Sequence, residues 1–187
     1  MGHHQPHEES GLAADVKKAT GVVAEKCYQC GKCSAGCPVA DEMDLPPSLV
    51  MRMLQTNQPE NDEKILRSKT IWLCLTCEMC IARCPMSIDI PKVMDFLREK
   101  SRTEKKISSN ANDIVAFHDS FLLSVEKTGK LYELGLIAAY KLKTFHLMQD
   151  VAIAPAMIQK GKLHFIPEMV KDRGNLSSIF SKTIKKK

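Results

Sequence analysis

A duplicated cysteine motif constrains this chain more than any other feature of its sequence. The pattern C-x2-C-x2-C-x3-C-P occurs twice, 47 positions apart, as Cys27, Cys30, Cys33, Cys37 and Pro38, and as Cys74, Cys77, Cys80, Cys84 and Pro85. Three thiolates at positions i, i+3 and i+6 can wrap one corner of a cubane, with the intervening N–H groups turned toward its sulfides. Each copy of the motif therefore predicts ligands for a [4Fe–4S] cluster.

The fourth cysteine of each motif points away from that corner, and in two-cluster ferredoxins it ligates the other cluster. We therefore expect cluster 1 to be held by Cys27, Cys30, Cys33 and Cys84. Cluster 2 is expected to be held by Cys37, Cys74, Cys77 and Cys80. Each cluster would then be tied to both halves of the motif region.

Zinc and disulfides are the alternative interpretations of these cysteines. Zinc prefers two C-x2-C pairs from separate turns, and three close cysteines crowd a single small ion. Disulfides require an oxidising compartment and do not account for a repeated spacing. Two [4Fe–4S] clusters are the favoured interpretation because they use all eight cysteines of the chain.

The same count limits the chemistry of the chain, because no cysteine remains as a nucleophile or redox-active pair. The sequence also contains no G-x-G-x-x-G fingerprint, Walker loop or His-Glu-x-x-His motif. We expect no catalytic residues and no further cofactor-binding residues. One-electron storage and relay is the function that remains.

Apolar residues recur at helical spacing along most of the chain, and no stretch alternates with period two. An all-α fold is therefore expected. Helices are predicted over 12–24 and 65–73, and in a segment where Asp44 would cap a helix that begins with Pro46 and Pro47. Three regions are expected: a lead-in with a short helix (1–26), a two-cluster domain (27–104) and a helical extension with a basic tail (105–187).

Charge and hydropathy limit the partners of the chain. Its net charge of +5 comes from the end, since residues 160–187 hold eight Lys or Arg and two Asp or Glu. Without aromatic interleaving or a known binding motif, this tail does not indicate nucleic acid. No secretory signal is visible, and the apolar stretch 134–140 is too short to cross a membrane. We expect a cytoplasmic protein that contacts neither nucleic acid nor membrane.

Two such motifs separated by helices resemble the α-helical ferredoxin domain, as in the C-terminal part of succinate dehydrogenase and fumarate reductase iron–sulfur subunits. The motif start from Cys27 to Cys33, the Trp72-x-Cys74 approach and the long helical C-terminus are similar to the C subunits of the soluble heterodisulfide reductases of methanogens. The resemblance is strong over 27–98. Over 105–187 it rests on length, helical character and a basic end.

The resemblance implies that two [4Fe–4S] clusters pass electrons from a flavin-containing subunit to the catalytic one. In the family, the catalytic subunit has cysteine-rich CCG motifs and reduces the coenzyme M–coenzyme B heterodisulfide of methanogenesis. A hydrogenase or formate dehydrogenase module is a further candidate partner. This chain has no adjacent cysteine pair and hence no CCG motif, which agrees with a non-catalytic electron-transfer subunit of an oxidoreductase complex.

Three rival functions remain open on the sequence. The chain could be an iron–sulfur relay subunit of another complex, of the heterodisulfide-reductase-like, fumarate-reductase-like or glycerol-phosphate-dehydrogenase-like kind. It could be a free ferredoxin-like carrier, although the long helical extension after the second motif is against this. It could also be a scaffold that binds zinc and no sulfide.

Overall fold

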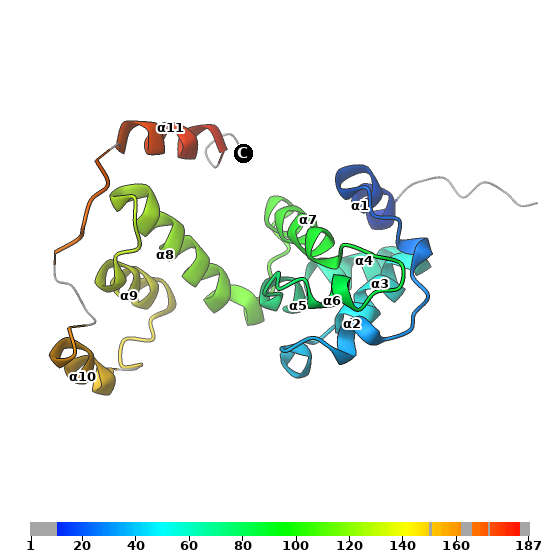
Figure 1. Cartoon of the computed structure of the whole chain (residues 1–187), viewed down its shortest axis with the longest axis horizontal. Helices are drawn as coiled ribbons and strands as arrows, with labels where there is room; N and C mark the ends of the chain where they lie inside the picture. The colour runs from blue at the N-terminus through cyan, green and yellow to red at the C-terminus, as the bar shows by residue number, and fades with distance from the viewer. Residues whose placement is uncertain (1–10, 150, 162–165, 172, 184–187) are drawn as a thin grey trace, which may run out of the picture. The chain divides into compact units, whose positions relative to one another are not determined.

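The structure is a computed structural model that describes residues 11–149, 151–161, 166–171 and 173–183. It divides the chain into two compact units, Met1–Ala111 and Asn112–Lys187. Helices are the only regular elements of the described residues, and none of these residues forms a strand (Figure 1). The prediction of an all-α fold is confirmed.

The first unit consists of short helices around the two cysteine motifs. The helices of this unit are α1 (Leu12–Thr20), η1 (Ala24–Lys26), α2 (Lys32–Ala35), η2 (Ala40–Glu42), α3 (Pro47–Thr56), α4 (Pro59–Leu66), α5 (Thr70–Leu73), α6 (Met79–Ala82), α7 (Ile90–Thr103) and η3 (Ser109–Ala111). The motifs themselves supply only the four-residue helices α2 and α6. The longer helices α1, α3, α4 and α7 therefore have to build the core that holds the motifs in place.

The core of this unit lies where α1, α3, α4, α5 and α7 pack together. Its large, fully buried apolar side chains are Val16, Val50, Met51, Leu54, Ile65, Ile71, Val93, Met94 and Leu97. Trp72 is 5% exposed and anchors α5 directly before the second motif. Burying a Leu, Ile or Met side chain contributes about 1.5–3 kcal/mol, so this apolar core stabilises the motif loops from behind.

Several predicted helix boundaries are wrong. The first helix ends at Thr20, because Gly21 adopts the left-handed conformation (φ 75°) and closes it. The predicted helix 65–73 is two helices, since α4 ends at Leu66 and α5 starts at Thr70. Helix α7 continues to Thr103. Ser101, on this helix, is buried in the core, where its hydroxyl donates to the carbonyl of Leu66 at 2.7 Å.

The predicted cap on α3 is also wrong. Pro46 occupies the N-cap position of α3, and the Asp44 side chain makes no bond to that helix. The Asp44 carboxylate instead accepts hydrogen bonds from Ser68 Oγ, the Lys69 N–H, the Thr70 N–H and Thr70 Oγ1, at 2.6 to 3.0 Å. Asp44 therefore fastens the chain after the first motif to the start of α5, which leads into Cys74.

The second unit contains α8 (Asn112–Thr128), α9 (Glu133–Thr144), η4 (Val151–Ile153), α10 (Ala154–Gln159) and α11 (Arg173–Thr183). Helices α8 and α9 pack side by side, and α11 contacts α8 (Figure 1). Few of its described apolar side chains are buried, Leu136 and Phe180 among them. Phe145, Met148 and Leu142 are among those that are largely exposed. In the described part of the chain, no helix has the length and hydropathy to cross a membrane.

Candidate metal centre

The two cysteine motifs fold into loops of the same backbone conformation. In the first loop Gln29 and Gly31 adopt positive φ (58° and 74°), and in the second the equivalent Thr76 and Glu78 do so (51° and 62°). Alternating residues of right- and left-handed conformation turn successive N–H groups toward one side of a loop, which forms an anion-binding concavity. Both motifs therefore present a cradle suited to a negatively charged cluster.

The backbone hydrogen bonds that close the loops are repeated as well. The Gly31 carbonyl accepts from the N–H groups of Ser34 and Ala35, and the Glu78 carbonyl accepts from those of Ile81 and Ala82. The fourth cysteine of each motif continues the pattern, since Cys37 N–H donates to Ser34 and Cys84 N–H to Ile81. Glycine adopts the left-handed conformation at Gly31 without steric cost. The same conformation costs the equivalent residue Glu78, which has a side chain, roughly 1 kcal/mol.

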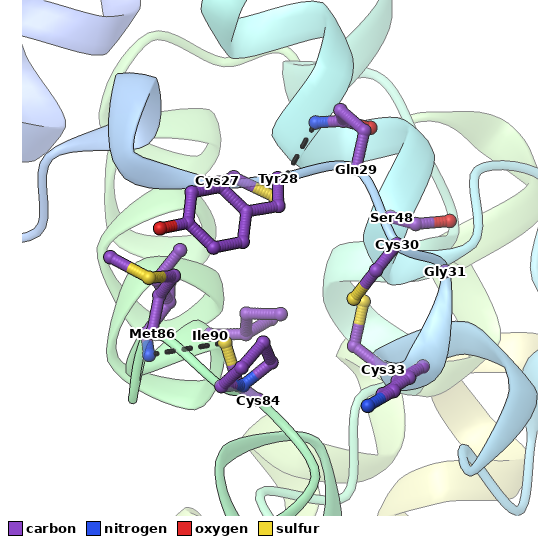
Figure 2. Close-up of a pocket in the computed structure, with 13 residues that line it drawn as sticks. Cys27, Tyr28, Gln29, Cys30, Gly31, Cys33, Ser48, Cys84, Met86 and Ile90 are labelled. Atoms are coloured by element: carbon purple, nitrogen blue, oxygen red, sulfur yellow. Dashed lines mark hydrogen bonds between the residues drawn. The ribbon is translucent and has the colours of Figure 1, made fainter.

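The fold brings cysteines from both motifs together around two pockets. One pocket is lined by Cys27, Cys30, Cys33 and Cys84, which surround a common space in Figure 2. The other is lined by Cys37, Cys74, Cys77 and Cys80. Each pocket thus contains three cysteines of one motif and the fourth cysteine of the other motif. The buried side chain of Ile90 lines both pockets, so the two lie close together in the first unit.

Most of the remaining lining of both pockets is apolar. Met86 and Ile88 lie beside the first set of cysteines, and Val39, Met43 and Met79 lie beside the second. All eight cysteines are free; Cys30 and Cys77 are exposed, and the other six are partly buried. Four thiols in a pocket with a mostly apolar lining form a donor set that suits an iron–sulfur cluster.

Burial makes several of these thiols hard to ionise in the absence of metal. Burial, together with the nearby Cys74, raises the pKa of the Cys80 thiol to about 11. Burial also raises the pKa of Cys33 and of Cys74, and the proximity of Cys37 adds to the shift at Cys74. Because thiolate is the form that ligates metal, cluster binding must displace these protons and will depend on pH.

Two hydrogen bonds reach the sulfur atoms of the first set. Gln29 Nε2 lies 3.4 Å from Cys27 Sγ, and the Ile88 N–H donates to Cys84 Sγ at 3.5 Å (Figure 2). The orientation of the Gln29 amide follows from Gln55, whose Nε2 donates to the carbonyls of Ala24 and Cys27. The Gln55 Oε1 therefore faces Gln29 and must accept from its Nε2, at 2.9 Å.

The second loop is held from behind by Arg98 on α7. Its guanidinium donates to the carbonyls of Ile71 and Cys74 and pairs with Asp95 at 2.7 Å. This contact fixes the first cysteine of the second motif against the longest helix of the unit. No local pattern in the sequence indicates these roles for Arg98, Gln55 or Asp44, because each acts on a segment at least 24 residues away.

The fold and the paired cysteine pockets define an all-α iron–sulfur domain for two clusters. Comparison with known families agrees, since residues 23–88 match the 4Fe-4S dicluster domain. The predicted cofactor is confirmed: the chain binds two [4Fe–4S] clusters. The cysteines, the cradles and the apolar lining all fit this group.

Proteins to which the chain is similar include C subunits of heterodisulfide reductases, which are oxidoreductases. That of the ferredoxin:CoB-CoM heterodisulfide reductase of Methanosarcina acetivorans is 34% identical over 80 residues, which are 43% of this chain and 31% of that protein. The iron–sulfur protein of the CoB–CoM heterodisulfide reductase of Methanopyrus kandleri is 28% identical over 105 residues, 56% of this chain and 50% of that protein. The relative from Methanothermobacter marburgensis, named for an H2:CoB-CoM heterodisulfide,ferredoxin reductase, is 30% identical over 46% of this chain and 45% of that protein.

The predicted resemblance to the C subunits of heterodisulfide reductases is therefore confirmed. The matches span between about a third and a half of the length of these relatives. The dicluster model covers the motif region and does not extend into the second unit.

Proposed function

We propose that this chain is the iron–sulfur electron-transfer subunit of a heterodisulfide reductase complex. In this role it receives electrons from a flavin-containing subunit. It passes them to the catalytic subunit that reduces the coenzyme M–coenzyme B heterodisulfide. The proposal rests on one observation above all: the two cysteine pockets share the Ile90 side chain and together use every cysteine of the chain. The clusters supply one-electron storage, and the protein holds them close together and excludes water from between them.

We also propose the crossed ligand sets, with Cys27, Cys30, Cys33 and Cys84 on cluster 1 and Cys37, Cys74, Cys77 and Cys80 on cluster 2. The lining of the two pockets supports this assignment. Serine variants test it by potentiometric electron paramagnetic resonance. Cys84→Ser and Cys30→Ser should change the same signal, and Cys37→Ser and Cys77→Ser the other. If Cys84→Ser and Cys77→Ser change the same signal, each motif holds its own cluster and the crossed assignment is wrong.

The chain itself carries no substrate chemistry in this proposal, and its action requires partner subunits. Following the sequence-based regions, we propose that 27–104 carries the clusters and 105–187 docks partners. Support comes from the second unit, where an apolar cavity of about 560 Å³ is lined by Phe117, Ile137, Tyr140, Ile153 and Met157, among others. Phe145 and Met148 are each 82% exposed and add to the apolar surface of this unit, and large exposed apolar patches are typical of interaction sites.

The partners we propose are the flavin-containing protein and the CCG-motif catalytic protein of the complex, with a hydrogenase or formate dehydrogenase module as a further candidate. Clustered free thiols favour a reducing compartment, and we place the complex in the cytoplasm. Anaerobic purification from the source, followed by identification of the co-purifying chains, tests this assignment. A flavoprotein and a CCG-motif protein should co-elute. A stable monomer with full activity would overturn it.

The alternative is a relay subunit of another heterodisulfide-reductase-like or fumarate-reductase-like oxidoreductase. The same purification separates the two, because that complex would contain a different catalytic subunit. Iron and acid-labile sulfide analysis excludes a zinc scaffold independently. Two clusters of four iron atoms require about eight iron atoms and about eight sulfides per chain.

A further inference from the structure

The two cysteine pockets carry opposite charges at their openings. Among the residues that line the first pocket, the one charged side chain is Lys32. Among those that line the second, the one charged side chain is Glu78. Both side chains are exposed, and neither has an ion pair in the described part of the chain. Each pocket thus presents a single fixed charge to solvent, positive at one and negative at the other.

Neighbouring residues strengthen this contrast. The charged residues that line a pocket, or directly adjoin a lining residue in sequence, differ in sign between the two. The first pocket has two basic residues and one acidic residue, Lys26, Lys32 and Asp89; Arg83 adjoins Cys84 in sequence, but its side chain lies against Gly36, next to Cys37 of the second pocket. The second has four acidic residues and one basic residue, Glu42, Asp44, Glu78, Asp89 and Lys92, while Arg98 on the Cys74 carbonyl is paired with Asp95. The lining side chains of the two openings therefore differ in charge, with Lys32 at one and Glu78 at the other, although the backbones of their loops are the same.

Each opening also has exposed apolar groups beside the charge. Tyr28 follows the first cysteine of the first motif and is 70% exposed, and Leu75 is 59% exposed at the equivalent position of the second. Met79, next to Glu78, is 42% exposed. Apolar side chains with a charged rim are typical of protein interfaces, where the charges steer the encounter and select the partner.

We infer that the two cluster openings are docking sites sorted by charge. The opening at Tyr28 and Lys32 takes a redox protein with carboxylates around its cofactor. The opening at Leu75 and Glu78 takes one with Lys or Arg around its cofactor. This inference rests on the proposed relay function, and it adds which surface each kind of partner uses. Opposite charges would keep the donor and the acceptor from competing for one cluster.

Two small outer-sphere oxidants of opposite charge can test the local fields without either partner. In each reaction one electron leaves a reduced cluster, returning it to its oxidised state, and converts Co(III) to Co(II), with no proton transferred. The probes are the cobalt(III)–EDTA anion and the hexaamminecobalt(III) cation. Stopped-flow absorbance of the clusters gives the oxidation rate of the dithionite-reduced full chain at low salt. The variants are Lys32→Glu and Glu78→Lys.

Lys32→Glu should slow oxidation by the anion about threefold, which is the Coulomb effect of reversing one charge about 10 Å from a singly charged probe in weakly screened water. Glu78→Lys should slow oxidation by the triply charged cation about 30-fold on the same reasoning, because the Coulomb energy is three times as large. Both effects should disappear in 1 M salt. Lys18→Glu and Glu60→Lys are the matched controls, because both residues are exposed on other helices of the first unit and change net charge equally.

Charge sorting is overturned if either variant changes its rate no more than its control does. It is also overturned if both variants act mainly on the same probe. Iron and sulfide analysis of each variant is done first. Loss of clusters from the unmodified chain would instead count against the relay function. Where a reversal variant fails to assemble its clusters, Lys32→Gln and Glu78→Gln should give half the effect on the logarithm of the rate.

Discussion

A substitution at Asp44 tests directly whether contacts between distant segments stabilise the second cluster loop. Its carboxylate accepts four hydrogen bonds from residues Ser68 to Thr70, and α5 then carries the chain into Cys74. We predict that Asp44→Asn loosens this segment and makes cluster 2 easier to lose. Asparagine keeps the size of the side chain, so the change removes the charge and one acceptor without creating a cavity.

The expected size follows from the pKa of this carboxyl. Partial burial opposes its ionisation, but the hydrogen bonds from Ser68, Thr70 and Lys69 outweigh burial and lower the pKa from 3.8 to about 2. Such a difference corresponds to roughly 2.5 kcal/mol without solvent screening. Because Asp44 is largely exposed, we reduce this to about 1 kcal/mol. The asparagine N–H2 then faces a backbone donor, which costs about 1 kcal/mol more.

A loss of about 2 kcal/mol should raise the fraction of open molecules roughly 30-fold. The assay is the rate at which the visible absorbance of the clusters is lost in moderate urea under anaerobic conditions. The folded-state pKa is lowered, so the carboxylate's stabilisation is complete above about pH 4 and is lost as the pH falls toward 2. The difference between the variant and the unmodified chain should therefore stay constant from pH 6 to pH 8.

Asp41→Asn is the matched control, since Asp41 lies in η2 on the same connection and is exposed. It should leave the rate unchanged. If Asp44→Asn behaves like Asp41→Asn, the hydrogen bonds to residues 68–70 do not hold the loop. If the difference titrates between pH 6 and pH 8, the stabilisation does not come from the carboxylate.

Three further predictions concern other contacts of the first unit. Gly36→Ala places a Cβ about 2.5 Å from the Arg83 side chain, so it should cost up to about 1 kcal/mol of stability, and Arg83→Ala in the same chain should abolish that cost in a double-mutant cycle. Lys100→Met removes the ion pairs to Asp15 and Glu104, both at 2.8 Å; thermal stability should fall by less than about 1 kcal/mol, and the loss should vanish in 1 M salt. Gln55→Leu frees the Gln29 amide that donates to Cys27 Sγ, and redox titration should show the potential of cluster 1 falling by about 20 mV while cluster 2 is unchanged.

Much of the site could be predicted because the information is local. The cysteine spacing determines the loop, and the loop determines which sulfur atoms converge, so two short motifs were enough to predict the cofactor. The apolar spacing of Val93, Met94 and Leu97, which are all fully buried on α7, is likewise a local signal of an amphipathic helix. The left-handed residue at Gly31 is typical of glycine. The equivalent residue Glu78 gives no such signal, because the cluster loop imposes that conformation on an ordinary residue.

The misassigned cap shows why the rest could not be predicted. Asp44 precedes two prolines at the start of a helix, which is the local signature of an N-cap. Its oxygens have a better alternative, since the Ser68, Lys69 and Thr70 donors converge on them. A rule based on neighbours in sequence cannot register donors 24 to 26 residues away. The same holds for Arg98 and Gln55, whose targets lie on other elements.

The duplication makes two equal cradles, so any difference between the two clusters must come from side chains that differ between the copies. Gly36 and Arg83 are equivalent positions, and the Arg83 side chain lies against Gly36. Two arginines could not occupy this contact, so the repeat must be asymmetric where its halves meet. The equivalent pairs Gly31 and Glu78, and Lys32 and Met79, differ in charge at the openings. If electrons enter at one cluster and leave at the other, positions such as these can make the two openings fit different partners, because the repeated backbone is the same at both.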